Sequence, residues 1–187
     1  MKKGLTLLVC VAVLSTSLIA RENHHKTYGR GDKIVSSPES VIELTKEQED
    51  SLNFMYQEEK VARDVYRVLG DKWKIRIFKN IQKSEQRHMK AIKSLLEKYN
   101  LPIPVIEDET GVFDNEDLQA LYEGLVDRGL SSKEEALRVG ILIEETDIAD
   151  LEERIVDAPN KIKRVFSRLL KGSQNHLRAF NRVLDKL

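Results

Sequence analysis

Hydrophobic residues recur every three or four positions through most of the sequence after residue 44, which predicts amphipathic helices. The first expected helix begins at Thr45, which forms a capping box with Gln48, and it ends at Gly70. The second runs from about Lys74 to Tyr99. The hydrophobic stripes of these two helices consist of Leu52, Met55, Ala62, Tyr66 and Leu69 in the first and Phe78, Ile81, Ile92 and Leu95 in the second.

A break in the helical pattern follows the second helix. Asn100 and Pro102 stop that helix, and residues 101–113 are expected to form a loop with two prolines. A short helix is then expected from about Asn115 to Arg128, closed by a glycine at the next position. The segment between the second and third long helices is therefore about thirty residues long.

Two further long helices complete the predicted fold. The third reaches about Val156, and the fourth follows Pro159 and continues to the C-terminus. Two alternative caps begin the third helix, Ser131 with Glu134 or Ser132 with Glu135. The residues of the fourth helix expected to face inward are Val165, Leu169, Leu177, Phe180 and Leu184.

The lengths of the connections predict how the long helices are arranged. Tight turns join the first helix to the second and the third to the fourth, whereas a long crossover joins these two hairpins. The expected fold class is therefore all-α, a ferritin-like four-helix bundle with a long crossover that carries a short extra helix.

Charge and cysteine content narrow the functional classes. The chain has 187 residues with 31 Lys and Arg against 31 Asp and Glu, so its formal net charge is zero. A nucleic-acid partner is disfavoured, because such proteins usually carry a basic excess. The single cysteine, Cys10, excludes a disulfide framework and a cysteine-ligated zinc or iron–sulfur centre within one chain.

The N-terminal segment has the pattern of an export signal. Lys2 and Lys3 precede an uncharged, mostly apolar run from Leu5 to Ala20, which is short for a membrane span. We expect residues 1–20 to be a signal peptide, residues 21–44 a flexible linker and residues 45–187 the bundle domain. The protein is therefore expected to be exported, either released into the periplasm or medium or held at the membrane by an uncleaved signal.

Polar residues interrupt the hydrophobic stripes at matching depths. Glu85 and His88 break the stripe of the second helix, and their spacing of three residues places them on one face. Burying a carboxylate and an imidazole is costly unless they are paired or bind a metal. The corresponding residues on the other long helices are Glu59 or its neighbour Glu58 on the first, Glu144 and Asp147 on the third, and His176 on the fourth, where Ser173 lies one turn earlier.

This pattern is typical of a carboxylate-bridged bundle with two metal ions, in which two helices supply Glu and two supply Glu-x-x-His. Carboxylates and imidazoles suit iron or manganese, so two iron ions are expected, with manganese as the alternative. The candidate metal ligands are Glu59 or Glu58, Glu85, His88, Glu144, Asp147 and His176.

The combined motifs resemble an uncharacterised bacterial and archaeal ferritin-like family, which is distantly related to rubrerythrin. The resemblance covers residues 45–187. The segments that carry it are EEKVARDVY at 58–66, SEQRHM at 84–89, GVF at 111–113, GILIEETDIADL at 140–151 and GSQNHLRAF at 172–180.

The likeness to rubrerythrin implies a choice between neighbouring residues. Its first helix has a ligand Glu followed by Ala, Arg and Tyr at positions that match Ala62, Arg63 and Tyr66, which favours Glu59 over Glu58.

The resemblance is less complete on the last two helices. The third helix of rubrerythrin carries Glu-x-x-Glu, to which Glu144 and Asp147 are the nearest match, with Glu145 as an alternative. On the fourth helix, Ser173 stands where the family pattern has Glu. One bridging carboxylate is therefore missing, which leaves three alternatives: Asp147 substitutes for it, the site is asymmetric, or the site holds one ion.

The resemblance implies a redox protein that oxidises ferrous iron or reduces peroxide. Peroxide or oxygen would be the substrate, and electrons would come from a separate donor protein, because the mature chain has no cysteine to hold a second iron centre. A homodimer is compatible with the sequence. The alternatives are a non-catalytic metal-binding module and a structural envelope bundle that has lost its metal, which Ser173 favours.

Overall fold

The computed structural model describes residues 43–103, 109–113 and 115–187, and in these ranges the chain is all-helical. The expected signal peptide at 1–20 and nearly all of the expected linker at 21–44 lie outside the described residues. Among the described helices, none is both long and apolar enough to span a membrane. The five helices are α1 (Lys46–Trp73), α2 (Arg76–Lys98), α3 (Glu116–Leu130), α4 (Lys133–Ile155) and α5 (Asn160–Leu184).

The capping box predicted for the first helix is confirmed, but the predicted end is wrong. The Thr45 hydroxyl accepts from the backbone of Gln48, whose side chain accepts from the backbone of Thr45. The helix passes through Gly70 and ends at Trp73, where Lys74 caps it with a left-handed φ of 57°. A Cβ at position 70 would lie 3.0 Å from the Cβ of Phe78. The glycine therefore allows α1 and α2 to approach closely at their turn instead of ending α1.

The other helix boundaries lie close to those predicted. Asn115 caps α3, and Ser132, one of the two predicted candidates, caps α4 by accepting from the Glu135 backbone at 3.0 Å. Gly129 does not close α3 but lies inside it. A Cβ there would lie 2.6 Å from a Leu69 methyl group, and the Gly129 carbonyl accepts a hydrogen bond from the Trp73 indole. Gly129 therefore allows α3 to pack closely against the end of α1.

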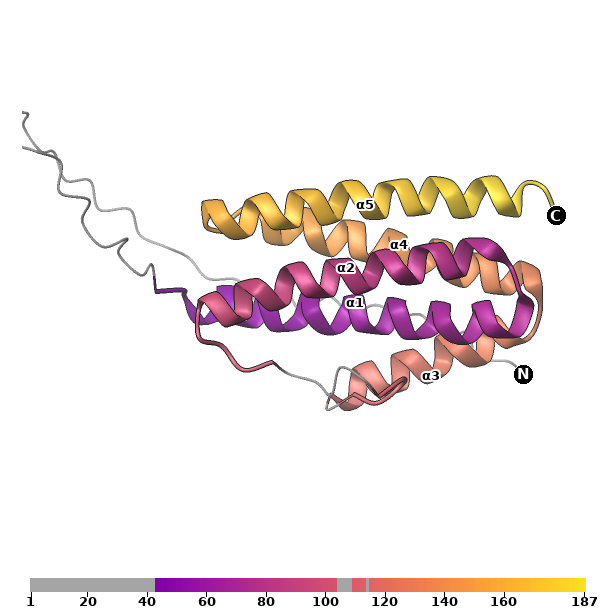
Figure 1. The fold of residues 1–187 in the computed structure, drawn as a ribbon, viewed down its shortest axis with the longest axis horizontal. Helices are drawn as coiled ribbons and strands as arrows, with labels where there is room; N and C mark the ends of the chain where they lie inside the picture. The colour runs from indigo at the N-terminus through magenta and orange to yellow at the C-terminus, as the bar shows by residue number, and fades with distance from the viewer. Residues whose placement is uncertain (1–42, 104–108, 114) are drawn as a thin grey trace, which may run out of the picture. The chain divides into compact units, whose positions relative to one another are not determined.

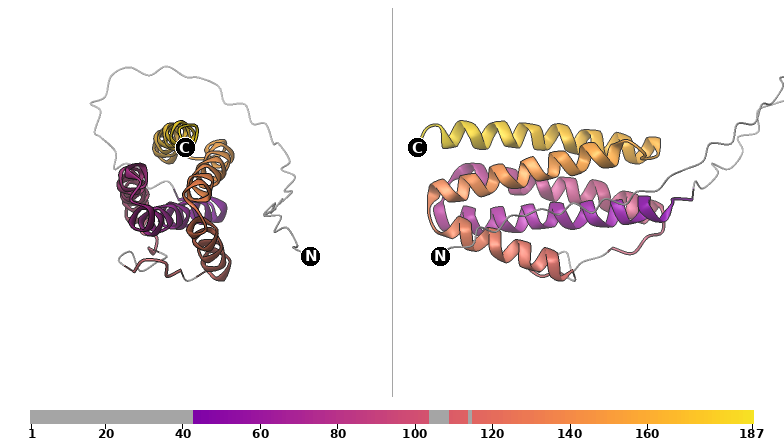
Figure 2. Two further views of the ribbon diagram at one scale, coloured as in Figure 1. Left: turned by 90° about the vertical axis from the view of Figure 1, so that its right-hand side faces the viewer. Right: turned by 180° about the vertical axis from the view of Figure 1, so that it is seen from behind.

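The four long helices form two hairpins that pack against each other (Figures 1 and 2). Helix α1 packs on α2 and α4 on α5, while the hairpins meet through α1 with α4 and α2 with α5. Helix α3 packs on α1 and α4. The segment that contains α3 returns along the bundle, so α4 runs in the same direction as α2 (Figure 1).

A buried ion pair fastens this crossover to α1. The Lys60 ammonium, which is fully buried, donates to Asp64 at 2.8 Å and to the backbone carbonyls of Glu109 and Val112 at 2.8 and 3.0 Å. The Gly111 backbone donates to the same Asp64 carboxylate. Because each of these groups has partners, the charges are satisfied without water, and they hold the crossover beside the middle of α1.

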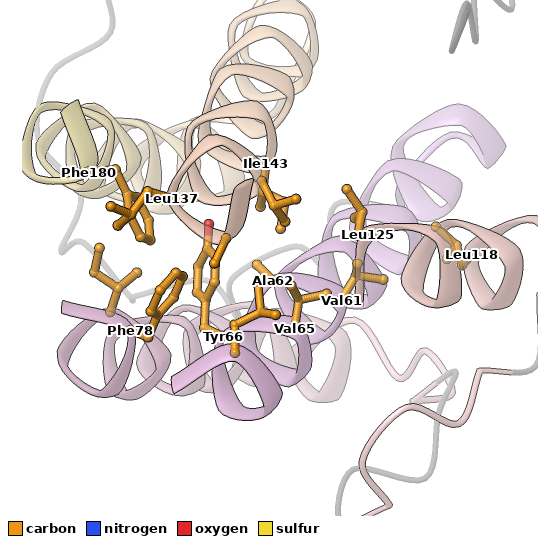
Figure 3. Packing of buried hydrophobic residues seen from close by; sticks show 14 of the residues in the cluster. Val61, Ala62, Val65, Tyr66, Phe78, Leu118, Leu125, Leu137, Ile143 and Phe180 are labelled. Carbon is orange, nitrogen blue, oxygen red and sulfur yellow. The ribbon is translucent and has the colours of Figure 1, made fainter. Parts of the chain in front are cut away.

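Two hydrophobic clusters fill the bundle, one near each end. In the cluster beside the α1–α2 turn, the rings of Tyr66, Phe78 and Phe180 pack together with centroids 5.2–5.9 Å apart (Figure 3). The second cluster includes Met89 and Phe166. Of the five inward positions predicted on the last helix, Leu169 and Phe180 are buried, whereas Val165, Leu177 and Leu184 are half-buried. All four long helices contribute to both clusters.

We predict opposite effects for alanine at two helical glycines. A Cβ at Gly140 would lie 2.6 Å from the Phe180 ring, so Gly140→Ala should destabilise the fold by about 1–2 kcal/mol through overpacking. A Cβ at Gly124 would meet no atom within 4 Å, so Gly124→Ala should stabilise α3 by about 0.5–1 kcal/mol. Denaturant unfolding of both variants measures the difference, and equal effects would contradict this packing.

Candidate metal centre

A layer of polar side chains separates the two hydrophobic clusters. Each long helix passes through this layer. Its apolar residues before the layer belong to one hydrophobic cluster, and those after the layer belong to the other. The layer contains all six of the residues predicted as ligands, together with one serine. Its members are Glu59 on α1, Glu85 and His88 on α2, Glu144 and Asp147 on α4, and Ser173 and His176 on α5.

Three of these side chains form a first possible ligand group. Glu59, Glu85 and His88 each offer one ligand atom, and the three atoms lie within 4.8 Å of one another. His88 Nδ1 lies 2.8 Å from a Glu85 oxygen and 3.2 Å from a Glu59 oxygen. Both glutamates are 2% exposed, so their carboxylates face the interior.

A second group of the same composition lies beside the first and shares Glu85 with it. Glu85, Glu144 and His176 again offer three atoms within 4.8 Å of one another. His176 Nδ1 lies 2.9 Å from the second Glu85 oxygen and 3.4 Å from Glu144. The rings of His88 and His176 stack with centroids 5.6 Å apart. The two oxygens of Glu85 therefore face two different imidazoles, which is the arrangement that a bridging carboxylate requires.

Unpaired atoms in this layer test whether a cation fits. Glu59 Oε1, Glu85 Oε1, Asp147 Oδ1 and His176 Nδ1 are buried, and none has a hydrogen-bond partner among the described residues. The 2.9 Å pair of Glu85 and His176 lacks hydrogen-bond geometry. Buried polar atoms are almost always paired, and carboxylate oxygens with imidazole nitrogens are ligands for divalent metals. The residues present therefore fit a metal ion.

Asp147 and Ser173 lie in the layer but outside both groups. Asp147 is 8% exposed and Ser173 is 1% exposed. The Ser173 hydroxyl donates to the backbone carbonyl of Leu169, one turn earlier, so α5 itself satisfies its proton. Asp147 lies close enough to Ser173 and Glu85 for both to affect its pKa. A carboxylate beside Ser173 is thus supplied by α4.

The structure distinguishes the neighbouring residues that the sequence left as alternatives. Glu145 is exposed, whereas Glu144 is 2% exposed and belongs to a ligand group. Glu58 is half-buried and belongs to neither ligand group; burial, followed by the charges of Asp150 and Asp147, raises its pKa. Glu59 and Glu144 are therefore the members of each pair that belong to a ligand group.

The charges of the layer are strongly coupled. Burial alone would raise the pKa of Glu85, but His176 and His88 lower it to about 2. Burial alone would lower the pKa of the histidines, but the facing carboxylates raise it to about 11 for His88 and about 9 for His176. Burial, with the charge of Glu85, raises the pKa of Glu144 to about 8. Protons on His88, His176 and Glu144 thus balance the negative charge of the buried carboxylates.

Tyr66 and Gly172 support the layer, and the sequence indicated neither role. The fully buried Tyr66 hydroxyl lies 2.7 Å from Glu144 and donates to it, which fixes that carboxylate. Tyr66 lies in the apolar stripe of α1, so its spacing indicates only core packing. A Cβ at Gly172 would lie 2.7 Å from His88 Nε2, so the glycine makes room for the imidazole. No periodicity of the sequence reports such a contact between helices.

An all-helical bundle with a buried carboxylate–imidazole layer defines a protein with a candidate metal centre. The chain belongs to the family described as uncharacterized protein domain DUF2202, which matches residues 48–187. One relative is the uncharacterized protein MJ0754 of Methanocaldococcus jannaschii. It is 52% identical over 143 residues, which cover 76% of this chain and 77% of the relative.

Two solved structures share the fold. The crystal structure of hypothetical protein MJ0754 from Methanococcus jannaschii DSM 2661 has a TM-score of 0.75 at 49% identity, covering 83% of this chain and 86% of that one. A DUF305 fragment from Deinococcus radiodurans has a TM-score of 0.59 at 18% identity, covering 76% of this chain and 98% of the fragment. The second likeness is one of fold alone.

We predict that the metal-free protein loses stability as pH rises. The raised pKa values of Asp147 (about 7) and Glu144 (about 8) contribute stability that is present at low pH and lost as pH rises through these values. The raised pKa values of His176 and His88 act in the same direction at higher pH. The lowered pKa of Glu85 acts oppositely, but only between its ordinary value of 4.5 and about 2.

Thermal unfolding with a chelator should therefore show Tm falling between about pH 5 and about pH 9. Bound Mn²⁺ should raise Tm, and by more at higher pH, because the metal must displace protons from its ligands. A metal-free Tm that rises steadily from pH 5 to pH 8 would contradict this account of the layer.

Proposed function

We propose that this protein is a ferritin-like four-helix-bundle protein, distantly related to rubrerythrin, that binds two metal ions and uses them to reduce peroxide or oxidise ferrous iron. Two features of the fold support the proposal. The hairpins α1–α2 and α4–α5 are joined by a crossover that returns along the bundle (Figure 1). The carboxylate–imidazole layer crosses all four long helices near their middles.

The observation that carries the proposal is the position of Glu85 between two ligand groups of the same composition. One ion would be held by Glu59 and His88 and the other by Glu144 and His176, with Glu85 bridging them. Oxygen and imidazole ligands suit iron, and manganese is the alternative.

Asp147 would take the place of the carboxylate that is missing at Ser173. It is buried, one of its oxygens has no hydrogen-bond partner, and it lies beside Ser173 and Glu85. The proposed centre is therefore asymmetric, with α4 supplying two carboxylates and α5 supplying only an imidazole.

Bound iron would supply the electron transfer that peroxide reduction requires, in which one H₂O₂, two electrons and two protons give two waters. The residues of this chain would hold the ions, exclude water and fix the ligands. Tyr66 would hold Glu144 by donating its hydroxyl proton to the carboxylate. The two hydrophobic clusters would close the layer from both ends of the bundle. We further propose that export by residues 1–20 places this activity outside the cytoplasm.

We predict that single ligand substitutions change the number of bound ions in a fixed pattern. The unsubstituted protein should bind two Mn²⁺ ions. Glu59→Gln or Glu144→Gln should leave one bound ion, and Glu85→Gln should leave none. Loss of an ion here means that its binding becomes more than about tenfold weaker. Glu145→Gln is the matched control, because Glu145 is exposed beside Glu144 and should leave both ions bound. Equilibrium dialysis followed by elemental analysis gives the counts. Equal binding by Glu85→Gln and unsubstituted protein would refute a shared carboxylate.

We also predict that the iron-loaded protein consumes peroxide when a reductant is supplied, with two reducing equivalents used per peroxide. Glu85→Gln should fall to the rate of free iron. Peroxide loss and reductant oxidation are followed together under anaerobic conditions. Tight iron binding without turnover would instead support a non-catalytic metal-binding or storage role, whereas failure to bind any metal would support the structural bundle without metal that Ser173 favours.

A further inference from the structure

Charge is distributed unequally among the helices, although the whole chain is formally neutral. Helix α5 contains seven Lys and Arg residues and no Asp or Glu. Helix α2 also contains seven, against two glutamates, of which Glu85 is buried in the layer and only Glu97 is exposed. Helix α4, in contrast, carries eight acidic residues and three basic ones. The neutral total therefore conceals strongly basic and strongly acidic surfaces.

The basic residues of α2 and α5 lie on the outer sides of these two helices. Their spacing of three, four or seven residues repeats the helical period, opposite the buried stripe. Most are exposed, and exposed members form two rows, one on each helix. The rows consist of Arg76, Lys79, Lys83, Arg87 and Lys90 on α2 and Lys161, Arg164, Arg168, Lys171, Arg178 and Arg182 on α5. We call these two rows the basic face.

The fold leaves the basic face uncovered by any described helix. Helices α2 and α5 contact each other, whereas α3 packs on α1 and α4 on the other side of the bundle (Figure 2, left). The acidic helix α4 and helix α1 border this face. A compact partner with an acidic surface could therefore cover the face, whereas an extended polyanion would also meet the acidic helix α4 at its border.

The most exposed members of the candidate metal centre come from the same two helices. His88 and His176, on α2 and α5, are each 12% exposed at the side chain, whereas the glutamates facing them are about 2–3% exposed. Their rings stack across the seam between the two helices, and Gly172 leaves space beside the His88 ring. The imidazoles are thus the most accessible members of both ligand groups, and they lie on the two helices that carry the basic face.

We propose that the basic face is the docking surface for an acidic electron-donor protein, which delivers its electrons at the His88–His176 side of the centre. This inference rests on the proposed function. Each peroxide reduced to two waters takes two electrons and two protons, so the donor is oxidised by two electrons in total. The sequence has one cysteine, Cys10, so this chain has no cysteine pair that could supply them. Charge complementarity of this kind speeds association and is weakened by salt.

The test compares two triple variants with the same change in charge. Lys83→Glu, Arg168→Glu and Lys171→Glu reverse three exposed residues of the basic face. Lys46→Glu, Lys133→Glu and Arg138→Glu reverse three exposed residues on α1 and α4. Neither set includes a proposed ligand. The probe is a small acidic [2Fe–2S] ferredoxin, and a basic cytochrome c serves as the opposite control.

Binding is measured first, on Zn²⁺-loaded protein, so that this result does not depend on turnover. The ferredoxin should bind at low salt and at least about tenfold more weakly in 0.5 M NaCl. Reversing the face should weaken binding at least about tenfold, whereas the control set should change it less than about threefold. Cytochrome c should not bind the basic face. No ferredoxin binding, or equal loss with both sets, would overturn the proposal.

Three competing occupants are tested with the same variants. Binding of vesicles containing anionic lipid and of duplex DNA is measured directly, and self-association of the protein is measured by sedimentation. Tighter binding of vesicles or DNA than of ferredoxin, or a dimer that only the face reversal dissociates, would assign the face to that partner instead.

Turnover is measured last, with iron-loaded protein. Reduced ferredoxin should support peroxide consumption, and reversing the basic face should slow this reaction at least about tenfold. The rate with a small neutral reductant should not change. Ferredoxin binding without any peroxide consumption would refute the proposed function but keep the docking surface.

Discussion

The burial of Glu85 between two imidazoles is the interaction on which the rest of this structure depends. A single carboxylate in a protein interior is costly, and removing one partner of a buried charge pair is costlier still. One Glu85 oxygen faces His88 of the same helix, α2, and the other faces His176 of α5. His88 also faces Glu59 of α1, and His176 also faces Glu144 of α4. The charges are therefore balanced only when all four long helices are present and in register.

This requirement explains why the hydrophobic core is divided. A bundle of this length could be filled by one continuous apolar core, yet every long helix interrupts its stripe at the same depth. The apolar clusters on both sides provide the stability that the polar layer lacks, and they keep water from the carboxylates. Conflicts of this kind between local burial and side-chain chemistry are expected at functional sites.

The sequence predicted the helices and most of the polar layer, because both depend on the helical period. Glu85 and His88 interrupt an apolar stripe, so their inward position could be read directly from their spacing. Spacing could not separate Glu144 from Glu145, which lie about 100° apart on one helix. The resemblance to rubrerythrin favoured Glu59 over Glu58, and the structure places Glu59 in the layer.

The sequence misled or gave no indication where contacts between helices determine the role of a residue. Gly70 has the position of a helix end, but the approach of Phe78 explains the glycine, and α1 continues for three residues. The hydrogen bond from Tyr66 to Glu144 joins residues 78 positions apart, which no local pattern can indicate. The segregation of basic residues onto α2 and α5 becomes visible only when the packing shows that these helices are neighbours.

The space beside Gly172 has a consequence for how the two hairpins are aligned. His88 fills the gap that the missing side chain leaves on α5. Shifting α5 by one residue, with the rotation of about 100° that the helical screw requires, would bring Lys171 or Ser173 against the ring, so the fit of the imidazole beside the glycine favours one alignment of the hairpins. A contact that serves the centre thereby also sets the relative position of two halves of the chain that are joined only by a long crossover.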